Sequence, residues 1–543
     1  MLRPHSFTRR RGAAIAAGLA TSALVLTGCA GGGSGDGGGS GDTITIGTSD
    51  KVTSIDPAGS YDNGSYAVMS QVYLSLFSVP PGGNAVEPNA AESGEFTSPN
   101  VFTVKLKPDL TFANGHALTS SDVKFSFDRQ LKINDPNGPA SLLGDLESVE
   151  TPDDLTVEFH LKSDNNVIFE QILTSPAGPI VDEEVFSPDA VTPDADIVAG
   201  QAFAGQYKID TFELNSLIEY SAFDGYKGSL GPAVTPTVLV SYYTDTTNLK
   251  LDIQQGNIDV AYRSLSSTDI ADLRTNENVT VHDGPGGELR YLVFNFDTMP
   301  FGAKTPEADP AKALAVRQAM ADLIDREAIA DSVYAGTYEP VYSHVPSGLP
   351  GATEPLKGLY GDKEGGASVD AAKARLAAAG ITEPITLNIQ YSNDHYGPSS
   401  ADEYAQVKDQ LESSGLFTVN LQTTEWTQYS DDRVSDVYPI YQLGWFPDYS
   451  DADNYLTPFF VKDNFLGNHY DNPEVASLIE AQSSEQDEAK RLEMLGQIQD
   501  LEANDLSTLP ILQGSQIAVS KTDITGVTLD ASFIFRYGSL GRG

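Results

Sequence analysis

One acidic run in the sequence, with Asp448, Asp451 and Asp453, could ligate a cation. Carboxylates at alternate loop positions are typical of calcium sites of the EF-hand type. Those sites also need Asp or Asn at the fifth position, Gly at the sixth and Glu at the twelfth. Counted from Asp451, these positions hold Tyr455, Leu456 and Lys462. The run therefore predicts no EF-hand, and its acids need another role.

Motifs for nucleophilic, phosphoryl-transfer and zinc chemistry are missing from the sequence. It contains no G-x-S-x-G, no P-loop, no H-E-x-x-H and no pair of cysteines. Its seven histidines are scattered singly, and a lone histidine is more often a surface or hydrogen-bonded residue than a metal ligand. The 76 acids offer glycosidase-like pairs at many places, so their number favours no pair. We predict no catalytic residue, no metal site, no cofactor and no enzymatic activity.

The net charge of the chain limits the classes of partner that it is expected to bind. Its 543 residues include 33 Lys and Arg against 76 Asp and Glu, which gives a formal net charge of −43 at pH 7. Nucleic acids and anionic lipid headgroups are bound through clustered Lys and Arg, which this composition does not favour. At about 150 residues per domain, the length allows several domains with cores of their own. We expect a globular protein that binds no nucleic acid.

The N-terminus predicts export and a lipid anchor. Four arginines precede an apolar stretch, 13–26, that is shorter than the ~20 residues needed to span a bilayer. It ends in Leu-Thr-Gly-Cys29, which resembles the bacterial lipobox, and Cys29 is the only cysteine. We predict a lipoprotein signal peptide at 1–28, lipidation of Cys29, and a flexible Gly/Ser tether at 29–41. The alternative is a plain signal peptide with a chance cysteine.

The rest of the chain alternates strand and helix signals. Residues 43–46, 101–106, 387–391 and 419–421 read as strands. Helices are predicted at 310–334 after an Asp-Pro start, at 368–380, at 400–415 behind a Ser400/Glu403 capping box, and at 487–504. Strand, helix and strand in succession predict an α/β fold.

Several ordered blocks resemble family 5 of the extracellular solute-binding proteins, the dipeptide and oligopeptide receptors of ABC importers. They are 105–112 (KLKPDLTF) with 118–127 (LTSSDVKFSF), then 291–295 (YLVFN) with 316–320 (VRQAM) and 324–329 (IDREAI), and finally 444–449 (GWFPDY) with 454–456 (NYL). The chain departs from the family pattern at 203–207, which is FAGQY, and at Ala452, where the family has Pro.

The resemblance implies a two-lobed α/β clamshell that closes over its ligand, with an extra subdomain in the first lobe. We expect lobe one at 42–285 plus 511–543, with the subdomain at about 77–200, and lobe two at 286–510. The Gly-Pro-Gly-Gly stretch 284–287 suits a crossing between lobes, because glycine absorbs backbone rotation at little cost. The implied protein is a monomeric receptor on the outer face of the cytoplasmic membrane that delivers peptides to ABC permease subunits.

The family also implies a ligand site. Asp448 falls at the position of the aspartate that binds the peptide ammonium, and Gly444, Trp445 and Phe446 fall on the strand that pairs with the peptide backbone. The cation that meets the peptide carboxylate in an oligopeptide-binding relative is replaced by Gln442. Arg433 and His395 are the candidates for that end.

Two alternatives remain open. The same receptor could carry a sugar, a nickel complex or another solute, because members of the family share the scaffold and differ in the pocket. A secreted acidic hydrolase is a third hypothesis, and it would require a catalytic constellation that the sequence does not contain.

Overall fold

The computed structural model describes residues 43–543 apart from 84, 264, 398, 531 and 533. The predicted signal peptide, Cys29 and the Gly/Ser tether lie outside the described residues. Among the residues that are described, no helix has the length and apolar character needed to cross a membrane.

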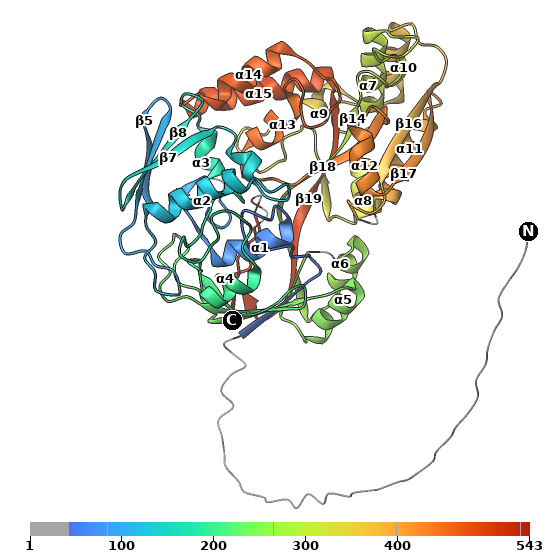
Figure 1. The fold of residues 1–543 in the computed structure, drawn as a ribbon. Coiled ribbons are helices and arrows are strands. Elements are labelled where there is room, and N and C mark those ends of the chain that lie inside the picture. Colours follow the sequence, from blue (N-terminus) through green and yellow to red (C-terminus); the bar gives the residue numbers. More distant parts are fainter. Residues whose placement is uncertain (1–42, 84, 264, 398, 531, 533) are drawn as a thin grey trace, which may run out of the picture. The chain divides into compact units, whose positions relative to one another are not determined.

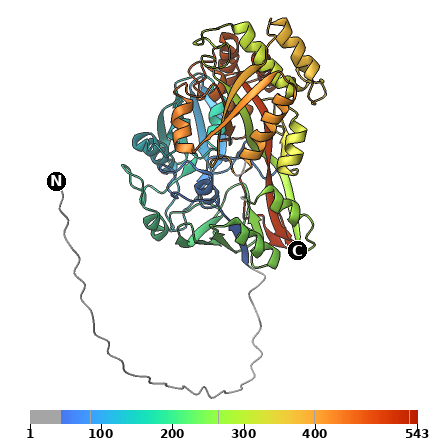
Figure 2. The same ribbon diagram turned by 90° about the vertical axis from the view of Figure 1, so that its right-hand side faces the viewer.

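A mixed eleven-stranded sheet organises the described chain. Ten of its strands follow the order β10 (Tyr207–Glu213), β11 (Leu217–Ala222), β12 (Thr237–Tyr242), β1 (Thr43–Thr48), β13 (Val260–Tyr262), β19 (Thr508–Lys521), β14 (Val279–Phe294), β18 (Ile440–Trp445), β16 (Ile385–Ser392) and β17 (Phe417–Thr424). The eleventh strand, β15 (Tyr338–Pro340), pairs with β19. The long antiparallel strands β14 and β19 lie side by side at the middle of this order. Figures 1 and 2 show β19, in red, as a long strand that runs through the described chain.

The ladder between β14 and β19 is interrupted at the predicted crossing. Pairing runs from Val279 to Gly284, stops, and resumes at Glu288 opposite Gly514. A Cβ placed on Gly286 would lie 1.7 Å from the carbonyl oxygen of Gly514, so only glycine fits there. Three residues of β14, 285–287, therefore lie outside the ladder. They separate the part of β14 that pairs only with β19 from the part that also pairs with β18.

Residues near both ends of the chain build one core. The helices of this region are α1 (Asn63–Val72), α4 (Asp194–Gly200), α5 (Thr246–Gln255) and α6 (Ser267–Leu273). Asp62 caps α1 by accepting a hydrogen bond from the amide of Ser65 at 2.8 Å. The buried apolar cluster joins Ile44 and Ile46 of β1 with Phe535 and Leu540 near the C-terminus. This region therefore closes around the last segment of the chain.

A four-stranded antiparallel sheet forms a second core in the first half of the chain. Its order is β5 (Ala91–Ser98), β6 (Val101–Leu106), β8 (Thr156–Leu161) and β7 (Leu146–Asp153), accompanied by α2 (Ser120–Ile133), η1 (Ala140–Leu143) and α3 (Ile168–Ile172). Phe102, Phe127, Phe159 and Phe169 pack within this cluster. Three two-stranded pairs complete the strands: β2 (Leu74–Ser75) with β9 (Pro179–Ile180), β3 (Phe77–Ser78) with β4 (Glu87–Pro88), and β20 (Ile524–Thr525) with β21 (Gly541–Arg542).

The second half of the chain carries most of the helices. They are α7 (Pro310–Leu323), α8 (Arg326–Tyr334), α9 (Pro355–Leu359), α10 (Val369–Ala378), α11 (Ser400–Ser413), α12 (Trp426–Arg433), η2 (Ala452–Tyr455), α13 (Thr457–Phe460), α14 (Pro473–Ser483) and α15 (Glu488–Asp505). Two buried clusters, drawn from residues between 289 and 512, hold this half together. The other three clusters draw on residues 44–279 and 518–540. The described clusters thus fall into two sets of residues, and the bounds of the lobes stay a prediction.

Two of the predicted helix boundaries are wrong. The single helix expected at 310–334 is two helices, because Ile324 is extended and the side chain of Asp325 caps α8 through the amide of Ala328 at 2.9 Å. Ser400 does not cap α11. It lies inside the helix and accepts a hydrogen bond from Gln442, while Glu403 accepts one from the hydroxyl of Tyr334. Both side chains make tertiary contacts instead of capping the helix.

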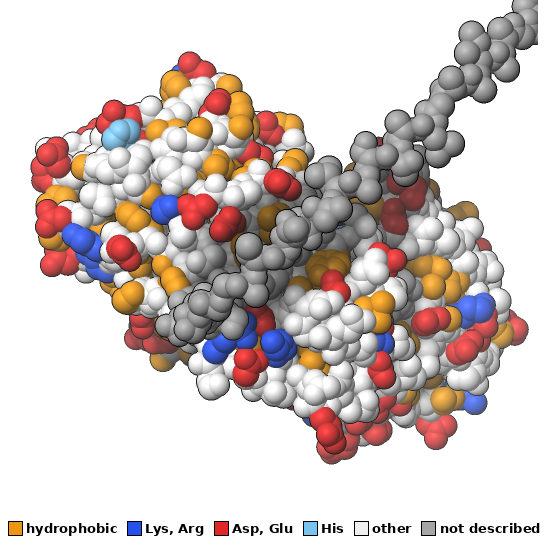
Figure 3. Space-filling model, turned by 90° about the horizontal axis from the view of Figure 1, so that it is seen from below, with side chains coloured by type: hydrophobic (Ala, Val, Ile, Leu, Met, Phe, Trp, Pro, Cys, Tyr) orange, Lys and Arg blue, Asp and Glu red, His pale blue; other side chains and the backbone are white. Residues whose placement is uncertain are grey.

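The acidic composition is visible at the surface. On the face seen in Figure 3, Asp and Glu side chains are spread over the described surface, and Lys and Arg side chains occupy fewer places. Most of the carboxylates face solvent, where a large net charge of one sign favours solubility.

Candidate functional site

Asp448 lies in the loop between β18 and η2, and its position is fixed by one amide side chain. The Oδ1 atom of Asn454 accepts hydrogen bonds from the amide of Asp448 and from Nε1 of Trp445, both at 2.9 Å. The Nδ2 atom of Asn454 donates to Oδ2 of Asp448 at 3.0 Å. The hydroxyl of Tyr61, from the segment before α1, donates to Oδ1. The carboxylate is thus held by neutral groups from both halves of the sequence.

Burial changes the acidity of this carboxyl group. Removal from water raises the pKa of Asp448 above its ordinary value, and the hydrogen bonds from Tyr61 and Asn454 partly offset that rise. Among the described residues, no lysine, arginine or histidine forms an ion pair with it, as the recorded side-chain partners are Tyr61 and Asn454. A poorly solvated carboxylate without a counter-ion is suited to bind a cation.

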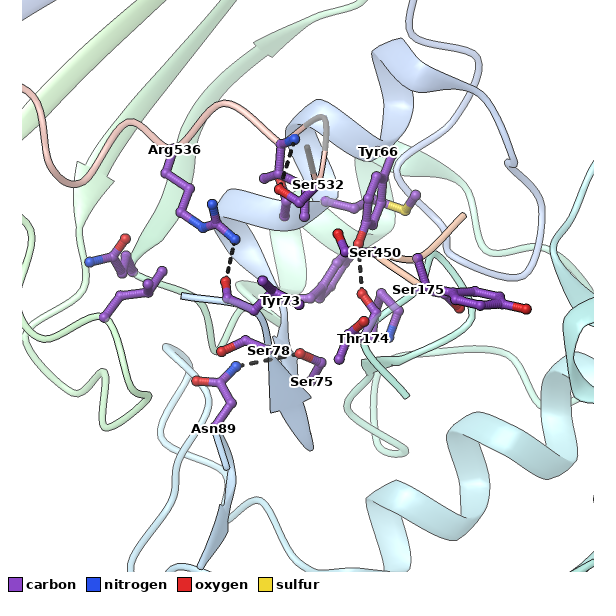
Figure 4. Close-up of a pocket in the computed structure, with 18 of the residues that line it drawn as sticks. Tyr66, Tyr73, Ser75, Ser78, Asn89, Thr174, Ser175, Ser450, Ser532 and Arg536 are labelled. Atoms are coloured by element: carbon purple, nitrogen blue, oxygen red, sulfur yellow. Dashed lines mark hydrogen bonds between the residues drawn. The ribbon is translucent and has the colours of Figure 1, made fainter. Parts of the chain in front are cut away.

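The pocket beside Asp448 is small and has both polar and apolar walls. It has a volume of about 70 Å³ and is lined by residues of α1, of the 174–179 loop, of the 448–450 loop and of the C-terminal segment. Figure 4 shows Tyr66 bonded to the carbonyl of Thr174 at 2.9 Å. Arg536 donates to the carbonyl of Val79 at 2.6 Å, so this guanidinium serves the structure of the wall.

The other two acids of the run are used inside the fold. Asp451 forms a two-bond ion pair with Arg491, at 2.6 and 2.9 Å. Asp453 is buried and accepts hydrogen bonds from the hydroxyls of Thr457 and Tyr449. Of the three carboxylates, Asp448 is the one held by neutral partners at a pocket.

Gly444 is required by close packing. A Cβ at this position would lie 2.8 Å from the ring of Tyr396 and 3.0 Å from the carbonyl oxygen of Leu289. The amide of Gly444 donates to the hydroxyl of Tyr396 at 2.9 Å. On this side, β18 pairs with β16 only at Ile440 and Tyr441. In the described structure, its last residues therefore have one edge without a strand neighbour.

The two aromatic residues after Gly444 face different surroundings. Trp445 packs against Phe459 and Phe465, with ring centroids 5.0 and 5.6 Å away, and its side chain supports the loop from the protein side. Phe446 lines a larger cavity of about 490 Å³ and lies 5.8 Å from the guanidinium of Arg263. Of the two, Phe446 is the one that lines a cavity.

The two predicted carboxylate partners are separated by the structure. His395 lines the larger cavity and stacks on Trp426 with centroids 3.6 Å apart. Burial lowers the pKa of His395 to about 4, so the ring is neutral at pH 7. Arg433 is buried at a different place. It donates a hydrogen bond to the carbonyl of Phe465 at 3.1 Å, and its guanidinium stacks on the ring of Phe465. Among the described residues that line the Asp448 pocket and the larger cavity, Arg433 is absent.

The sequence analysis did not find two residues of these walls. Tyr61 donates a hydrogen bond to Asp448, and Arg290 carries a positive charge on the wall of the larger cavity. Neither belongs to a motif. The register between β14 and β18 places Arg290 directly opposite Gly444, and this pairing joins segments far apart in the sequence. A strand alternation that puts an arginine among buried apolar residues was the available signal.

Among the described residues, two groups of side chains have the spacing of metal ligands. Asp297, Asp436 and His469 cluster together, but the ammonium of Lys304 lies 2.8 and 3.0 Å from the two carboxylates and already neutralises them. The other group, on β7 and β8, includes the exposed Glu150. Neither group touches the cavities described above.

Comparison with known proteins identifies the family. The sequence model of the bacterial extracellular solute-binding proteins, family 5, matches residues 85–467. The chain belongs to this family. The oligopeptide-binding protein OppA of Bacillus subtilis is 22% identical over 93% of this chain and 95% of its own length. Heme-binding protein A of Haemophilus influenzae is 24% identical over 84% of this chain and 84% of its own length.

The solved structures show the fold of a family 5 protein. The ABC transporter substrate-binding protein CtaP of Listeria monocytogenes superposes with a TM-score of 0.77 at 22% identity, covering 92% of this chain and 99% of that one. The expected two-lobed α/β fold is confirmed. The role of an extracytoplasmic solute-binding component follows from the family, and the residues described above form its candidate ligand site.

Proposed function

We propose that this family 5 protein is a lipid-anchored receptor that captures short peptides and delivers them to an ABC permease, without chemistry of its own. The observation that carries the proposal is Asp448, a carboxylate with neutral partners and a raised pKa at a small pocket. A peptide ammonium would supply the missing counter-ion. The printed name of the Bacillus subtilis relative, an oligopeptide-binding protein, supports the same cargo.

The open edge of β18 gives the proposal its second support. Residues after Tyr441 have no strand neighbour on one side within the described structure, and the amide of Gly444 is bonded only to a side-chain hydroxyl. An extended peptide can add to such an edge through main-chain hydrogen bonds, which read no side-chain identity. The Tyr396 hydroxyl accepts the hydrogen bond from the Gly444 amide that a peptide carbonyl would accept in the complex.

A ligand screen tests the cargo. Mass spectrometry of protein purified under native conditions should find retained peptides. Calorimetry should show that a zwitterionic tetrapeptide binds, whereas its N-acetylated form binds at least about a hundredfold more weakly. Retention of a sugar or a metal complex, with no heat from any peptide, would refute the peptide cargo and leave the receptor role intact.

A non-peptide cargo is the second candidate. The larger cavity is rich in aromatic side chains, among them Tyr334, Tyr338, Tyr396 and Phe446. One relative in the family is named for heme binding, so the scaffold accepts other solutes. A cargo that carries a cationic group would still use Asp448.

The anchor and the division into lobes are part of the proposal. Cys29→Ser should release the protein from membranes without changing affinity for its ligand, because the tether separates the two functions. Retention of the variant on salt-washed membranes would refute lipidation as the anchor. Lobe one at 42–285 plus 511–543 and lobe two at 286–510 should close on the ligand, which small-angle scattering would record as a smaller radius of gyration.

A further inference from the structure

Three side chains that can ligate a metal lie on one face of the four-stranded sheet (Figure 1). Glu150 is on β7, the edge strand, and Glu158 and His160 are on its neighbour β8. Val149 and Phe159, which alternate with them, are buried in the core of this sheet. Because successive side chains of a strand point to opposite faces, the three ligating residues share the outer face.

The register of the two strands brings these side chains together. In the antiparallel ladder, Glu150 is directly opposite Glu158, and His160 follows two residues later on the same face. One carboxylate oxygen of each glutamate and one ring nitrogen of the histidine lie within 4.8 Å of one another. A point within about 2.8 Å of all three atoms therefore exists, whereas zinc binds nitrogen and oxygen at about 2.0–2.2 Å. Movements of less than about 1 Å would complete the coordination.

The two carboxylates are not neutralised by the described protein. Like charges directly opposite each other on a sheet are destabilising. Among the described residues, neither Glu150 nor Glu158 forms an ion pair with a lysine or an arginine. Lys105, on the adjoining strand β6, donates to the hydroxyl of Thr156 at 2.5 Å instead. A divalent cation between the two glutamates would replace their repulsion by attraction.

The histidine is available to such a cation. In the part of the chain that the structure describes, its side chain has no hydrogen-bond partner, and its Nε2 atom is buried. A buried polar atom without a partner is unfavourable, so an ion that accepts a nitrogen lone pair would remove this cost. His160 and Glu158 are half-buried, and Glu150 is exposed. The Glu150 side chain can therefore rotate aside to admit an ion and then close over it.

The other group with metal-ligand spacing shows what this group lacks. The ammonium of Lys304 lies 2.8 Å from Asp297 and 3.0 Å from Asp436. The Nε2 atom of His469 lies 2.5 Å from Asp436. These side chains already satisfy one another, and an added cation would have to displace the lysine. No such internal cation stands between Glu150 and Glu158 in the described structure.

We propose that Glu150, Glu158 and His160 bind a zinc ion, which fastens the edge strand β7 to β8. One imidazole nitrogen and two carboxylate oxygens suit zinc better than calcium or magnesium, which prefer oxygen ligands alone. Three protein ligands leave the fourth tetrahedral position to water. Scattered single histidines predicted no metal site, and it is the pairing of the two strands that brings these ligands together. None of the three residues lines the Asp448 pocket or the larger cavity, so this site goes beyond the proposed peptide receptor.

Calorimetry on the full chain tests the site, after a chelator has removed metal and with no metal-binding tag present. Zinc should bind the wild type at one high-affinity site per chain. His160→Gln and Glu158→Gln should each weaken that binding at least about tenfold, the lower end of what the loss of a supporting residue costs. Asp297→Asn, in the group that Lys304 neutralises, is the matched control and should leave the affinity unchanged.

Thermal unfolding supplies a second measurement, in which the expected effects have opposite signs. Without metal, Glu158→Gln should unfold at a higher temperature than the wild type, because the repulsion from Glu150 is gone. Zinc should raise the unfolding temperature of the wild type, since it binds the folded state, and should leave that of Glu158→Gln unchanged. A variant that merely folds poorly would show the reverse of the first effect.

Three results would overturn the proposal. The wild type could bind no zinc, which would leave an ordinary charged edge strand. Zinc binding could survive both His160→Gln and Glu158→Gln, which would place the ion elsewhere. Calcium could bind as tightly as zinc and be indifferent to His160→Gln, which would show that the carboxylates act without the imidazole.

Discussion

Asp448 and Arg290 are both withdrawn from water near β18, yet they differ in how their charges are neutralised. Arg290 has Glu288 at 2.5 Å within the protein, whereas the recorded partners of Asp448 are the neutral Tyr61 and Asn454. Asp448, the acidic end, therefore has no charged partner within the described protein, whereas Arg290, the basic end, already has one. The difference indicates that a cationic group should matter more for affinity than an anionic one.

Removing the charge of the acidic end should have the largest effect. Asp448→Asn keeps the size of the side chain but leaves a ligand ammonium unpaired, which costs ~3–5 kcal/mol in buried pairs. This corresponds to roughly two to three and a half decades in affinity, less if water reaches the site. Calorimetry on wild type and variant with a peptide and its N-acetyl form gives the coupling energy. A coupling near zero would show that Asp448 does not hold the ammonium.

Crowding β18 at Gly444 should lower the stability of the fold. Gly444→Ala places a Cβ 2.8 Å from the ring of Tyr396, which stacks on the guanidinium of Arg290. Overpacking of this kind costs about 1–3 kcal/mol of unfolding free energy. Gly358→Ala is the control, because no atom lies within 4 Å of its added Cβ. Chemical denaturation measures both, and equal stability of the two variants would contradict the tight packing at Gly444.

Acid should weaken the acidic end and spare the basic end. Burial raises the pKa of Asp448, and only the ionised form attracts an ammonium, so affinity should fall by about tenfold per pH unit below that pKa. The pKa of Arg290 is raised, which keeps its guanidinium charged throughout. Titrations from about pH 4.5 to about pH 8, the region above the ordinary Asp pKa of about 3.9, measure the effect. An N-acetylated peptide should show a much weaker pH dependence.

Tyr61→Phe should produce the smallest change. The hydroxyl hydrogen bond lowers the pKa of Asp448, so its loss should move the pH midpoint of binding upward by roughly half a unit to one unit. The shift is modest because Tyr61 is 38% exposed and water can replace its hydroxyl. Tyr66→Phe is the matched control, since its hydroxyl bonds to Thr174. A midpoint that moves equally in both variants would exclude a specific role for Tyr61.

Local sequence signals predicted local structure well. The strand at Val101–Leu106 has the predicted bounds, and Ser368 caps α10 as expected. The capping box at Ser400 was wrong because Gln442, from another segment, bonds that hydroxyl. A cap depends on neighbours within one turn, whereas this contact depends on how two segments pack.

The candidate site was predictable only in part. Asp448 could be named as a candidate because it lies in the stretch 444–449, which resembles the family pattern. Its role in binding the ligand stays a prediction. Arg290 could not be found in this way, because its place opposite Gly444 is set by the pairing of β14 with β18. The neutral state of His395 depends on burial beside Trp426, which the sequence does not specify.

The core around Ile44 has a consequence for the order of folding during synthesis. Ala518, Phe535 and Leu540 belong to it, so the region that is made first cannot complete its interior until the end of the chain has emerged. The cluster around the four-stranded sheet needs no such wait, since its members lie between Leu74 and Ala204. Non-local contacts form late and leave apolar surface exposed in the meantime. The strand that supplies Ile44 and Ile46 is therefore the part of the nascent chain that waits longest for its partners and most needs protection from aggregation.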